Sequence, residues 1–414
     1  MIKQAFLGFL LLGAVAAAQD AGKQKNDPFG GVNPIKVDEA IRKGIDYLKS
    51  QEAVFASDPF GTHASELVLW TYVHAGLRPG NASFDALFKA MLDEPMKNTY
   101  RVSLQAMILE EVQRVKYQKQ IFKCAQFLVD NQCKNGQWGY GEPTTYPDPP
   151  ADDVASDGGV RNFGAEEPQE QKPKVVRKLP VKRQKDGPET GDNSNSQYAA
   201  LGLRACFDAG ITLPKDVAPR ARAWWRESIH DDEEKGKDGK PLVASGPGMV
   251  GSPSGWCYGG KAHGHKPYGS MTAGAVGSLA ITGYLLGEKN PRREIAVLRG
   301  LEWLGKEFTV AGNPGPSEHV PETGWMQCYF LYALERAGLL CGVETMGGHK
   351  WYPEGATLLL GAQKPDGSWL SPLPHGDRSR ELNSVWDTCF AILFLKRATR
   401  PLDVASTDRN RQAK

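Results

Sequence analysis

The sequence predicts an all-α fold in which about six helical hairpins close into a double ring, an α/α toroid, with a flexible insertion in the third hairpin. Three observations lead to this prediction. Amphipathic segments alternate with segments that are apolar on every side. One motif occurs twice, because Phe127 to Trp138 and Leu358 to Trp369 share the spacing of a Gln, a Gly and a Trp. Only residues 142–190 clearly interrupt the alternation.

The amphipathic segments are the expected outer helices. In the first of them, Ile41, Ile45 and Leu48 form an apolar stripe beside Arg42 and Lys43. The six expected outer helices cover 37–50, 83–93, 116–131, 217–229, 292–307 and 350–363.

The segments between them are the expected inner helices, rich in small and apolar residues as in Ser270 to Ala280. They cover 64–76, 99–112, 194–208, 270–286, 323–337 and 382–396. In a closed ring every inner helix starts at the same end, so their N-termini gather at one mouth. Exposed amides and the helix dipoles favour polar and anionic groups there.

The insertion at 142–190 is rich in Pro, Gly and charge, with an acidic first part and a basic second part. Such a composition buries too little apolar surface to offset the entropy of ordering, so we expect disorder. A smaller polar insertion, 230–254, interrupts the fourth hairpin.

The N-terminus has the pattern of a cleaved signal peptide. Lys3 precedes the apolar stretch 6–18, which ends in three alanines. We therefore expect a signal peptide at 1–18, a linker at 19–36, the toroid at 37–400 and a tail at 401–414. This organisation implies a secreted or periplasmic protein.

Composition excludes several function classes. The formal net charge is +2, which does not favour nucleic acid as a partner. No second long apolar stretch follows the signal peptide, so no membrane span is expected. The seven cysteines leave the pairing open, with Cys133, Cys257 and Cys341 in turn-like segments where disulfides are allowed.

The two repeated segments resemble the QW motif of the squalene-hopene and oxidosqualene cyclases, over residues 123–138 and 355–369. The segment 384–395 is similar to an inner helix of the same enzymes. The chain, including 191–198, also resembles bacterial secreted prenyltransferase and squalene-oxidase repeat proteins, a terpenoid-cyclase superfamily group. The resemblance implies an α/α toroid and leaves the reaction undefined.

The repeated residues also have a physical interpretation. A Gln amide at a helix end can pair with orphan carbonyls, a Gly permits positive φ, and a Trp can join neighbouring hairpins. We therefore predict structural roles for Gln132, Trp138, Gln363 and Trp369.

The chemistry that these relatives would need is largely missing. The cyclase resemblance implies an Asp-x-Asp-Asp acid, and no such motif occurs; Asp152-Asp153 and Asp231-Asp232 lack the first Asp. This departure argues against cyclase activity.

Two segments have the residue types of a metal site. Asp387-Thr388-Cys389 matches the zinc-ligand spacing of prenyltransferases, but residues i and i+2 do not share a helix face. His263-Gly264-His265, near Cys257, lies in an expected loop. We expect neither a metal nor a cofactor.

The candidate binding site lies at the inner-helix starts. A group of polar residues begins the third inner helix, and aromatic residues lie at other starts, including Tyr100 and Trp386. Helix capping and packing are the competing explanations. The predicted ligand-binding residues are Asp192, Asn193, Asn195, Trp256, Tyr258, Trp325 and Asp387.

The sequence thus favours a binding protein, or an enzyme of undefined chemistry, that takes a glycan, a peptide or another small molecule in its central cavity. One alternative is a polysaccharide lyase or hydrolase, in which Tyr100, Arg101 or His63 serve as base and charge neutraliser. The other alternative is a squalene-type cyclase or a prenyltransferase-like enzyme.

Overall fold

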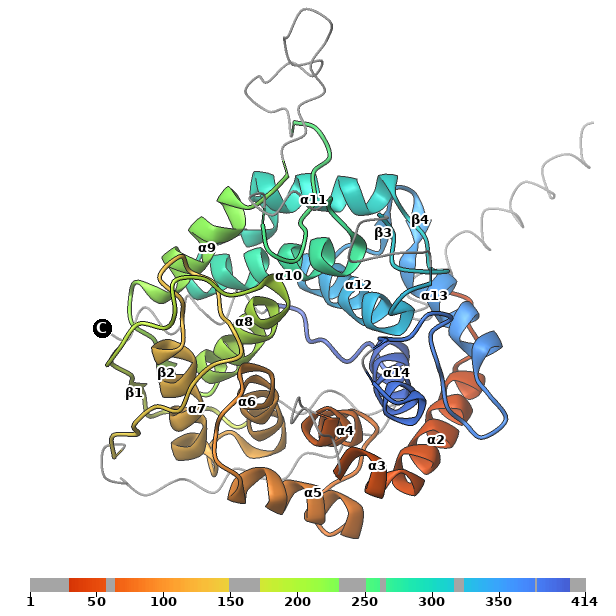
Figure 1. The fold of residues 1–414 in the computed structure, drawn as a ribbon, viewed down its shortest axis with the longest axis horizontal. Coiled ribbons are helices and arrows are strands. Elements are labelled where there is room, and N and C mark those ends of the chain that lie inside the picture. The colour runs from red at the N-terminus through yellow and green to blue at the C-terminus, as the bar shows by residue number, and fades with distance from the viewer. Residues whose placement is uncertain are drawn as a thin grey trace, which may run out of the picture.

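The computed structural model describes residues 30–56, 64–148, 172–230, 251–260, 266–315, 324–376 and 378–402. Its helices form two concentric rings around a central axis (Figure 1). The predicted signal peptide and most of the predicted tail lie outside the described residues. Within them, no helix has the length and apolar character to cross a membrane.

The outer ring consists of amphipathic helices, each with one buried face. They are α2 (Pro34–Ser50), α5 (Ala82–Asp93), α7 (Gln118–Asp130), α9 (Val217–Glu227), α11 (Ile295–Lys306) and α13 (Trp351–Ala362). In α2 the buried positions include Ile41, Ile45 and Leu48, the stripe expected from the sequence.

The inner ring consists of helices that are buried almost all round. They are α4 (Ala64–His74), α6 (Thr99–Gln113), α8 (Asn193–Asp208), α10 (Gly269–Leu285), α12 (Gln327–Cys341) and α14 (Arg380–Leu395). Small residues let these helices approach closely; a Cβ on Gly274 would lie 2.4 Å from Oε1 of Gln197 on the neighbouring helix.

The inner ring is closed. Each inner helix packs on the next, and α14 packs on α4, while α2 lies beside α13 and α14 (Figure 1). The two ends of the ring therefore meet, and the predicted all-α toroid of six hairpins is confirmed. The remaining elements are short: α3 (Glu52–Ala56), η2 (Pro291–Arg293), β1 (Leu179–Pro180), β2 (Ile211–Thr212), β3 (Thr345–Met346) and β4 (His349–Lys350).

The repeated Gln and Trp residues join one hairpin to the next. The Gln132 amide donates to the backbone oxygen of Val217 at the start of α9, at 2.9 Å. The Gln363 amide donates in the same way to Ala40 in α2, at 2.8 Å, which links the last hairpin to the first. Our expectation that these amides pair with orphan carbonyls at their own helix end differs from this geometry, because the acceptors belong to the neighbouring outer helix.

The two tryptophans make equivalent contacts. The Trp138 indole donates to the Leu128 carbonyl at 2.7 Å, and the Trp369 indole donates to the Leu359 carbonyl at 2.8 Å. The backbone nitrogens of both residues donate to a hydroxyl of the following inner helix, Ser196 in α8 and Thr388 in α14. Each Trp is therefore held between the outer and inner helices of its hairpin.

The helix expected at 323–337 begins four residues later, at Gln327. Gly324 and Met326 have positive φ values of 104° and 46°, and Trp325 between them bridges to Leu373. A residue with positive φ cannot continue an α-helix, so the chain turns here before α12 begins.

The predicted disorder of 142–190 is wrong for its described parts, 142–148 and 172–190. Leu179–Pro180 pairs in parallel with Ile211–Thr212, and Leu179 and Val181 are buried. The Gln184 amide nitrogen donates to Asp130 at 2.8 Å. The few apolar residues of the basic block alternate with charged ones, so a short buried strand forms where the average composition is polar. Residues 149–171 lie outside the described part.

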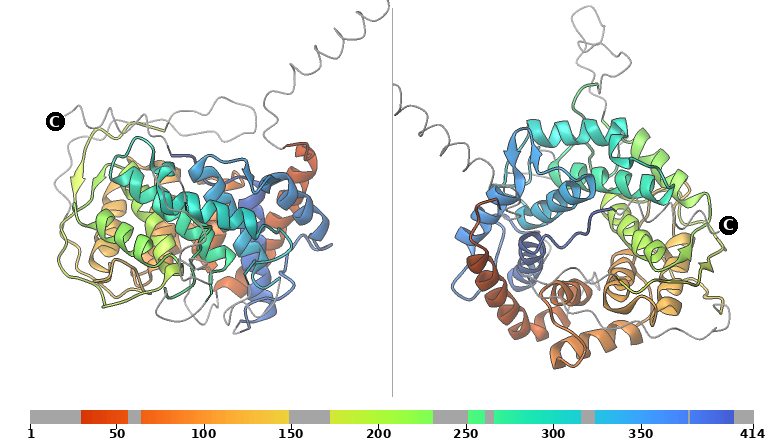
Figure 2. Two further views of the ribbon diagram at one scale, coloured as in Figure 1. Left: turned by 90° about the horizontal axis from the view of Figure 1, so that it is seen from above. Right: turned by 180° about the vertical axis from the view of Figure 1, so that it is seen from behind.

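The segment 396–402 crosses one end of the inner ring, at the helix C-termini (Figure 2, right). The Thr399 amide and hydroxyl both donate to the buried Glu335 carboxyl, at 2.8 and 2.7 Å. Arg204 donates to the backbone oxygens of Arg400 and Pro401, at 2.7 and 2.9 Å. The toroid predicted to end at 400 therefore includes a terminal segment that covers its far end.

The seven cysteines are all buried, and none forms a disulfide. The open question of pairing at Cys133, Cys257 and Cys341 is answered by this arrangement. Burial raises the pKa of the Cys341 thiol to about 12, so this thiol is a small buried hydrophobic group.

Candidate functional site

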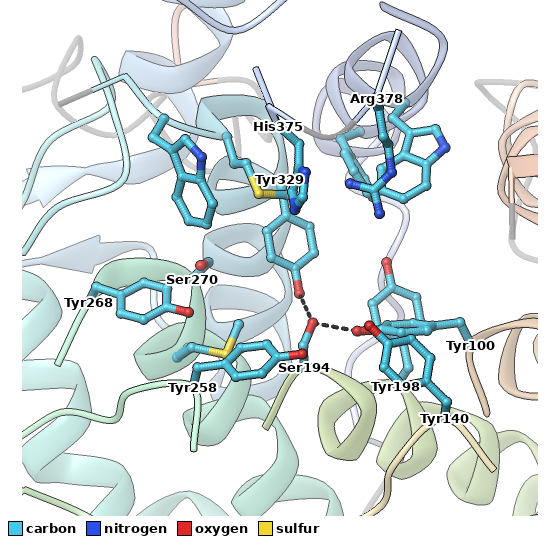
Figure 3. A pocket seen from close by; sticks show the side chains of 15 residues that line it. Tyr100, Tyr140, Ser194, Tyr198, Tyr258, Tyr268, Ser270, Tyr329, His375 and Arg378 are labelled. Atoms are coloured by element: carbon cyan, nitrogen blue, oxygen red, sulfur yellow. Dashed lines mark hydrogen bonds between the residues drawn. The ribbon is translucent and has the colours of Figure 1, made fainter. Parts of the chain in front are cut away.

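A cavity opens at the end of the ring where the inner helices begin. Its volume is about 680 Å³, within the range of small-molecule pockets. Figure 3 shows its side chains converging from α6, α8, α12 and the loops that precede α10 and α14. It is lined by Tyr100, Tyr140, Ser194, Tyr198, Tyr258, Tyr268, Ser270, Met271, Trp325, Met326, Tyr329, His375, Arg378, Trp386 and Phe390.

The lining is mostly aromatic, and six of its residues are tyrosines. Burial raises the pKa of Tyr100 and of Tyr268 well above the ordinary value of a phenol. The pKa of Tyr329 is also raised by burial, although the positive charge of Arg336 opposes the shift. These hydroxyls therefore stay protonated at neutral pH and offer hydrogen bonds without charge.

The floor of the cavity holds a cluster of hydrogen-bonded side chains, which we call the hydroxyl cluster: Tyr100, Ser194 and Tyr329. The Tyr100 hydroxyl donates to Ser194 Oγ at 2.6 Å, and Ser194 Oγ lies 3.0 Å from the Tyr329 hydroxyl (Figure 3). Each of the three residues is less than a tenth exposed. Behind them, the Gln197 amide nitrogen donates to the Tyr329 hydroxyl at 2.8 Å.

The rim carries the charged and titratable groups. The Arg378 guanidinium lies 3.9 Å from the centre of the Trp386 ring, in a cation–π arrangement. The His375 and Trp325 rings are 6.3 Å apart. Both Arg378 and His375 are half-buried and precede α14, so a ligand that enters the cavity passes them.

Two of the seven predicted ligand-binding residues line this cavity. Tyr258 lies before α10, and Trp325 lies before α12 with its ring 6.5 Å from that of Tyr268. Of the aromatic residues noted at the inner-helix starts, Tyr100 and Trp386 also line it. The expectation that aromatic rings gather at this mouth agrees with the geometry.

Asp192 is the N-cap of α8. Its carboxylate accepts from the Asn195 backbone nitrogen at 2.7 Å and from the Asn195 side-chain amide at 2.8 Å. Burial raises the pKa of Asp192, against the effect of these hydrogen bonds. The carboxylate is thus engaged by its own helix, and neither Asp192 nor Asn195 lines the cavity.

Asn193 connects three segments below the mouth. Its side-chain oxygen accepts from the Trp224 indole at 2.7 Å and from Gln137 at 3.2 Å. Its amide nitrogen donates to the Cys257 carbonyl at 2.8 Å. The surplus of amides at the start of α8 therefore satisfies buried backbone and side-chain groups, and the prediction of a ligand contact for Asn193 does not agree with the structure.

Trp256 occupies the position of Trp138 and Trp369 in a further hairpin. Its indole donates to the Trp225 carbonyl in α9 at 2.9 Å, and its backbone nitrogen donates to Thr272 in α10 at 3.1 Å. Its side chain is fully buried. The predicted ligand contact is replaced by packing because the motif recurs without its Gln and with a polar insertion before it.

Asp387 lies in the middle of α14, away from its start. Its carboxylate accepts from the Ser371 backbone nitrogen at 2.6 Å, and burial raises its pKa to about 6. Asp387 does not line the cavity, because α14 begins seven residues earlier, at Arg380. A zinc site with Cys389 is also unsupported, since the described residues contain no cluster of three metal-binding side chains.

The residues proposed for a lyase are only partly described. Tyr100 lines the cavity, whereas the Arg101 guanidinium pairs with Glu66 at 2.7 Å and with Glu94, outside the lining. His63, His263 and His265 lie outside the described residues. His230, which is described, has its Nε2 3.2 Å from the Cys257 sulfur.

The sequence analysis missed most of the lining. Tyr198, Tyr329 and Phe390 lie inside their helices rather than at the starts, so an additional helical turn of each inner helix belonged in the search. His375 and Arg378 lie in the loop before α14, which was considered only for its connection. Tyr140 follows the first repeated Trp by two residues and is the most exposed aromatic side chain of the rim.

The comparisons with known proteins concern the fold. No family model matches the chain, and no curated protein matches it. Among solved structures, the type II terpene cyclase MstE from Scytonema in its apo form is similar, with 12% identity and a TM-score of 0.31, over 88% of this chain and 98% of that chain. A variant of the same cyclase with its product, merosterolic acid A, has 12% identity and a TM-score of 0.32, over 88% and 97%. The likeness concerns the arrangement of helices alone, and the chain has an α/α-toroid fold of the terpenoid-cyclase type.

Proposed function

We propose that this protein is a binding protein for a small saccharide, held in the cavity at the inner-helix N-termini. The observation that carries the proposal is the lining: aromatic faces alternate with protonated hydroxyls from Tyr and Ser side chains. A sugar ring has an apolar face that packs on an aromatic ring, and a hydroxylated edge that pairs with donors and acceptors. The cavity supplies both kinds of contact from several helices at once.

Binding is favoured over hydrolysis by the absence of carboxylates. None of the described lining residues is Asp or Glu, and glycoside hydrolysis commonly uses two carboxylates that face the scissile bond. A lyase needs a base, and the raised pKa of Tyr100 keeps this phenol protonated at neutral pH. The lining thus offers recognition without an evident acid or base pair.

A second candidate is an isoprenoid cyclase, because the same aromatic faces would stabilise a carbocation. That reaction needs an acid in contact with the substrate. The two buried carboxyls that we considered, Asp192 and Asp387, are held by backbone groups outside the lining. The candidate therefore has the cation-stabilising surface and lacks a proton donor among the described residues.

The test is a binding experiment on the chain from Gln19 onward, with calorimetry against a panel of mono- and disaccharides. Trp325 lies in the cavity, so its fluorescence should change when a saccharide binds. Tyr258→Ala should weaken binding at least tenfold, whereas Tyr117→Ala, a half-buried tyrosine outside the cavity, should leave the affinity unchanged. If no saccharide binds, or if the protein converts squalene to cyclic products, the proposal is wrong.

We also propose export across the cytoplasmic membrane, on the strength of Lys3, the apolar stretch 6–18 and the small residues before Gln19. Mass spectrometry of the N-terminus after expression in a bacterium with a periplasm tests it. Recovery of the uncleaved chain in the cytoplasm would contradict the proposal.

A further inference from the structure

The hydroxyl cluster is connected to a buried guanidinium beneath it. Arg336 Nη2 donates to Gln197 Oε1 at 2.8 Å. This contact fixes the orientation of the Gln197 amide, because a guanidinium cannot accept a hydrogen bond. Gln197 Nε2 must then be the donor to the Tyr329 hydroxyl, which lies at 2.8 Å.

The hydrogens of the cluster can be counted. Tyr100 gives its hydroxyl hydrogen to Ser194, and Tyr329 already accepts from Gln197. Ser194 and Tyr329 together have two hydroxyl hydrogens but share only one hydrogen bond, at 3.0 Å. One hydrogen therefore has no acceptor among the described residues. Both hydroxyls line the cavity, so this hydrogen is directed to whatever fills it.

The charge behind the cluster is positive. Arg336 is 2% exposed, its Nη1 has no hydrogen-bond partner, and no described carboxylate lies within ion-pair distance of it. Its guanidinium lies 4.3 Å from the Tyr332 ring and 5.5 Å from the Tyr198 ring. The adjacent Glu335 is bound to Thr399 on the far side of the ring. A buried cation with so few partners favours negative charge nearby.

We propose that the ligand of this cavity carries an oxyanion, a carboxylate or a phosphate, and that the oxyanion accepts the remaining hydrogen of the Ser194–Tyr329 pair. Arg336 is then a positioning residue, which sets the direction of this donor through Gln197. The proposal rests on the proposed saccharide function and narrows it to acidic sugars.

Three soluble probes test the class of ligand: D-glucose, D-glucuronate and D-glucose 6-phosphate, each titrated by calorimetry at constant ionic strength. A hydrogen bond to a charged acceptor predicts that glucuronate or the phosphate binds roughly ten- to hundredfold more tightly than glucose. The stronger of the two charged probes identifies a carboxylate or a phosphate as the group recognised.

Tyr329→Phe removes the hydroxyl and keeps the ring, whose centre lies 5.3 Å from that of Phe390. This variant should lose the preference for the charged probe and retain the affinity for glucose. Tyr332→Phe is the matched control, because Tyr332 lies one turn further along α12, outside this cavity, and its hydroxyl accepts from Trp70. It should leave the ratio of the two affinities unchanged.

The role of Arg336 is measured by the same ratio. Arg336→Met should abolish the preference for the charged probe, and Arg336→Lys should restore part of it, because the charge returns without the planar fork. If Arg336→Met fails to fold, the Tyr329→Phe and Tyr332→Phe pair still decides.

The outcomes separate the two proposals. Glucose binding as tightly as both charged probes overturns the oxyanion and leaves the saccharide function standing. A preference for charge that survives Tyr329→Phe also overturns it, since the anion is then recognised elsewhere, for example at Arg378. Binding of none of the three probes, nor of any saccharide in the panel, overturns both.

Discussion

Exchanging two tryptophans for phenylalanine separates packing from recognition in this fold. Trp256 is fully buried, and its indole nitrogen donates to the Trp225 carbonyl at 2.9 Å. Trp256→Phe loses this hydrogen bond, worth about 1 kcal/mol. It also leaves a void that the ring of six helices cannot easily close, which adds roughly 1–2 kcal/mol. We expect a loss of roughly 2–3 kcal/mol in the free energy of unfolding and little change in ligand affinity.

Trp325→Phe is the matched change at the mouth. Trp325 is half-buried and lines the cavity, so the variant should lose less than about 1 kcal/mol of stability and should bind the ligand more weakly. Urea unfolding measures the first quantity and calorimetric titration the second. A Trp256→Phe protein with unchanged stability and lost binding would refute the assignment of Trp256 to packing.

Three further variants test the ring itself. Gly367→Ala should destabilise by roughly 1–3 kcal/mol, because Gly367 has φ of 88° and its Cβ would lie 2.4 Å from the Lys43 carbonyl oxygen; equal urea midpoints would contradict this. Glu335 has a folded pKa of about 7, raised by burial from 4.5, so its contribution to stability is complete below pH 4.5 and is lost as the pH rises through 7, by roughly 3 kcal/mol. Glu335→Gln should remove this part of the pH dependence, and parallel stability–pH curves for the two proteins would refute it. Lys172→Ala should cost roughly 3 kcal/mol, because it leaves two buried carboxylates, Glu110 and Glu111, short of a partner; unfolding at the wild-type urea concentration would show that Arg114 and Arg400 suffice.

The helices could be predicted from the sequence because their periodicity is strong. The stripe of Ile41, Ile45 and Leu48 marks an outer helix, and the small residues from 270 to 280 mark an inner one. The start of α12 could not be predicted in the same way, because it depends on the positive φ of Met326. A left-handed non-glycine residue leaves no compositional signal.

The basic part of the insertion shows how composition can mislead. Its charges average out the two positions, Leu179 and Val181, that pack beside Ile211. The partners of those charges are also distant in sequence: Lys172 pairs with Glu111 at 2.8 Å. Neither a short buried strand nor a long-range ion pair can be inferred from a local average.

The site was predicted correctly in position and wrongly in chemistry, for a geometric reason. Closure of the ring places all inner-helix starts at one mouth, which the hairpin count alone implies. Which side chains face the cavity depends on the rotation of each helix, and one residue changes the direction by 100°. Asn195 and Ser194 are neighbours in α8, yet Asn195 faces its own cap and Ser194 faces the cavity.

The two ends of the ring are chemically different, and this difference explains why the cavity is a blind pocket. At the far end, the segment 396–402 lies across the helix C-termini, where Thr399 binds Glu335 and Arg400 pairs with Glu111. Cations suit that end, because the C-terminal carbonyls carry partial negative charge. At the near end the helix N-termini favour an acceptor, and the only hydroxyl hydrogen of the Ser194–Tyr329 pair without a described partner points there. A ligand can therefore enter from one side only, and the polarity of the six inner helices favours entry with its negative end first.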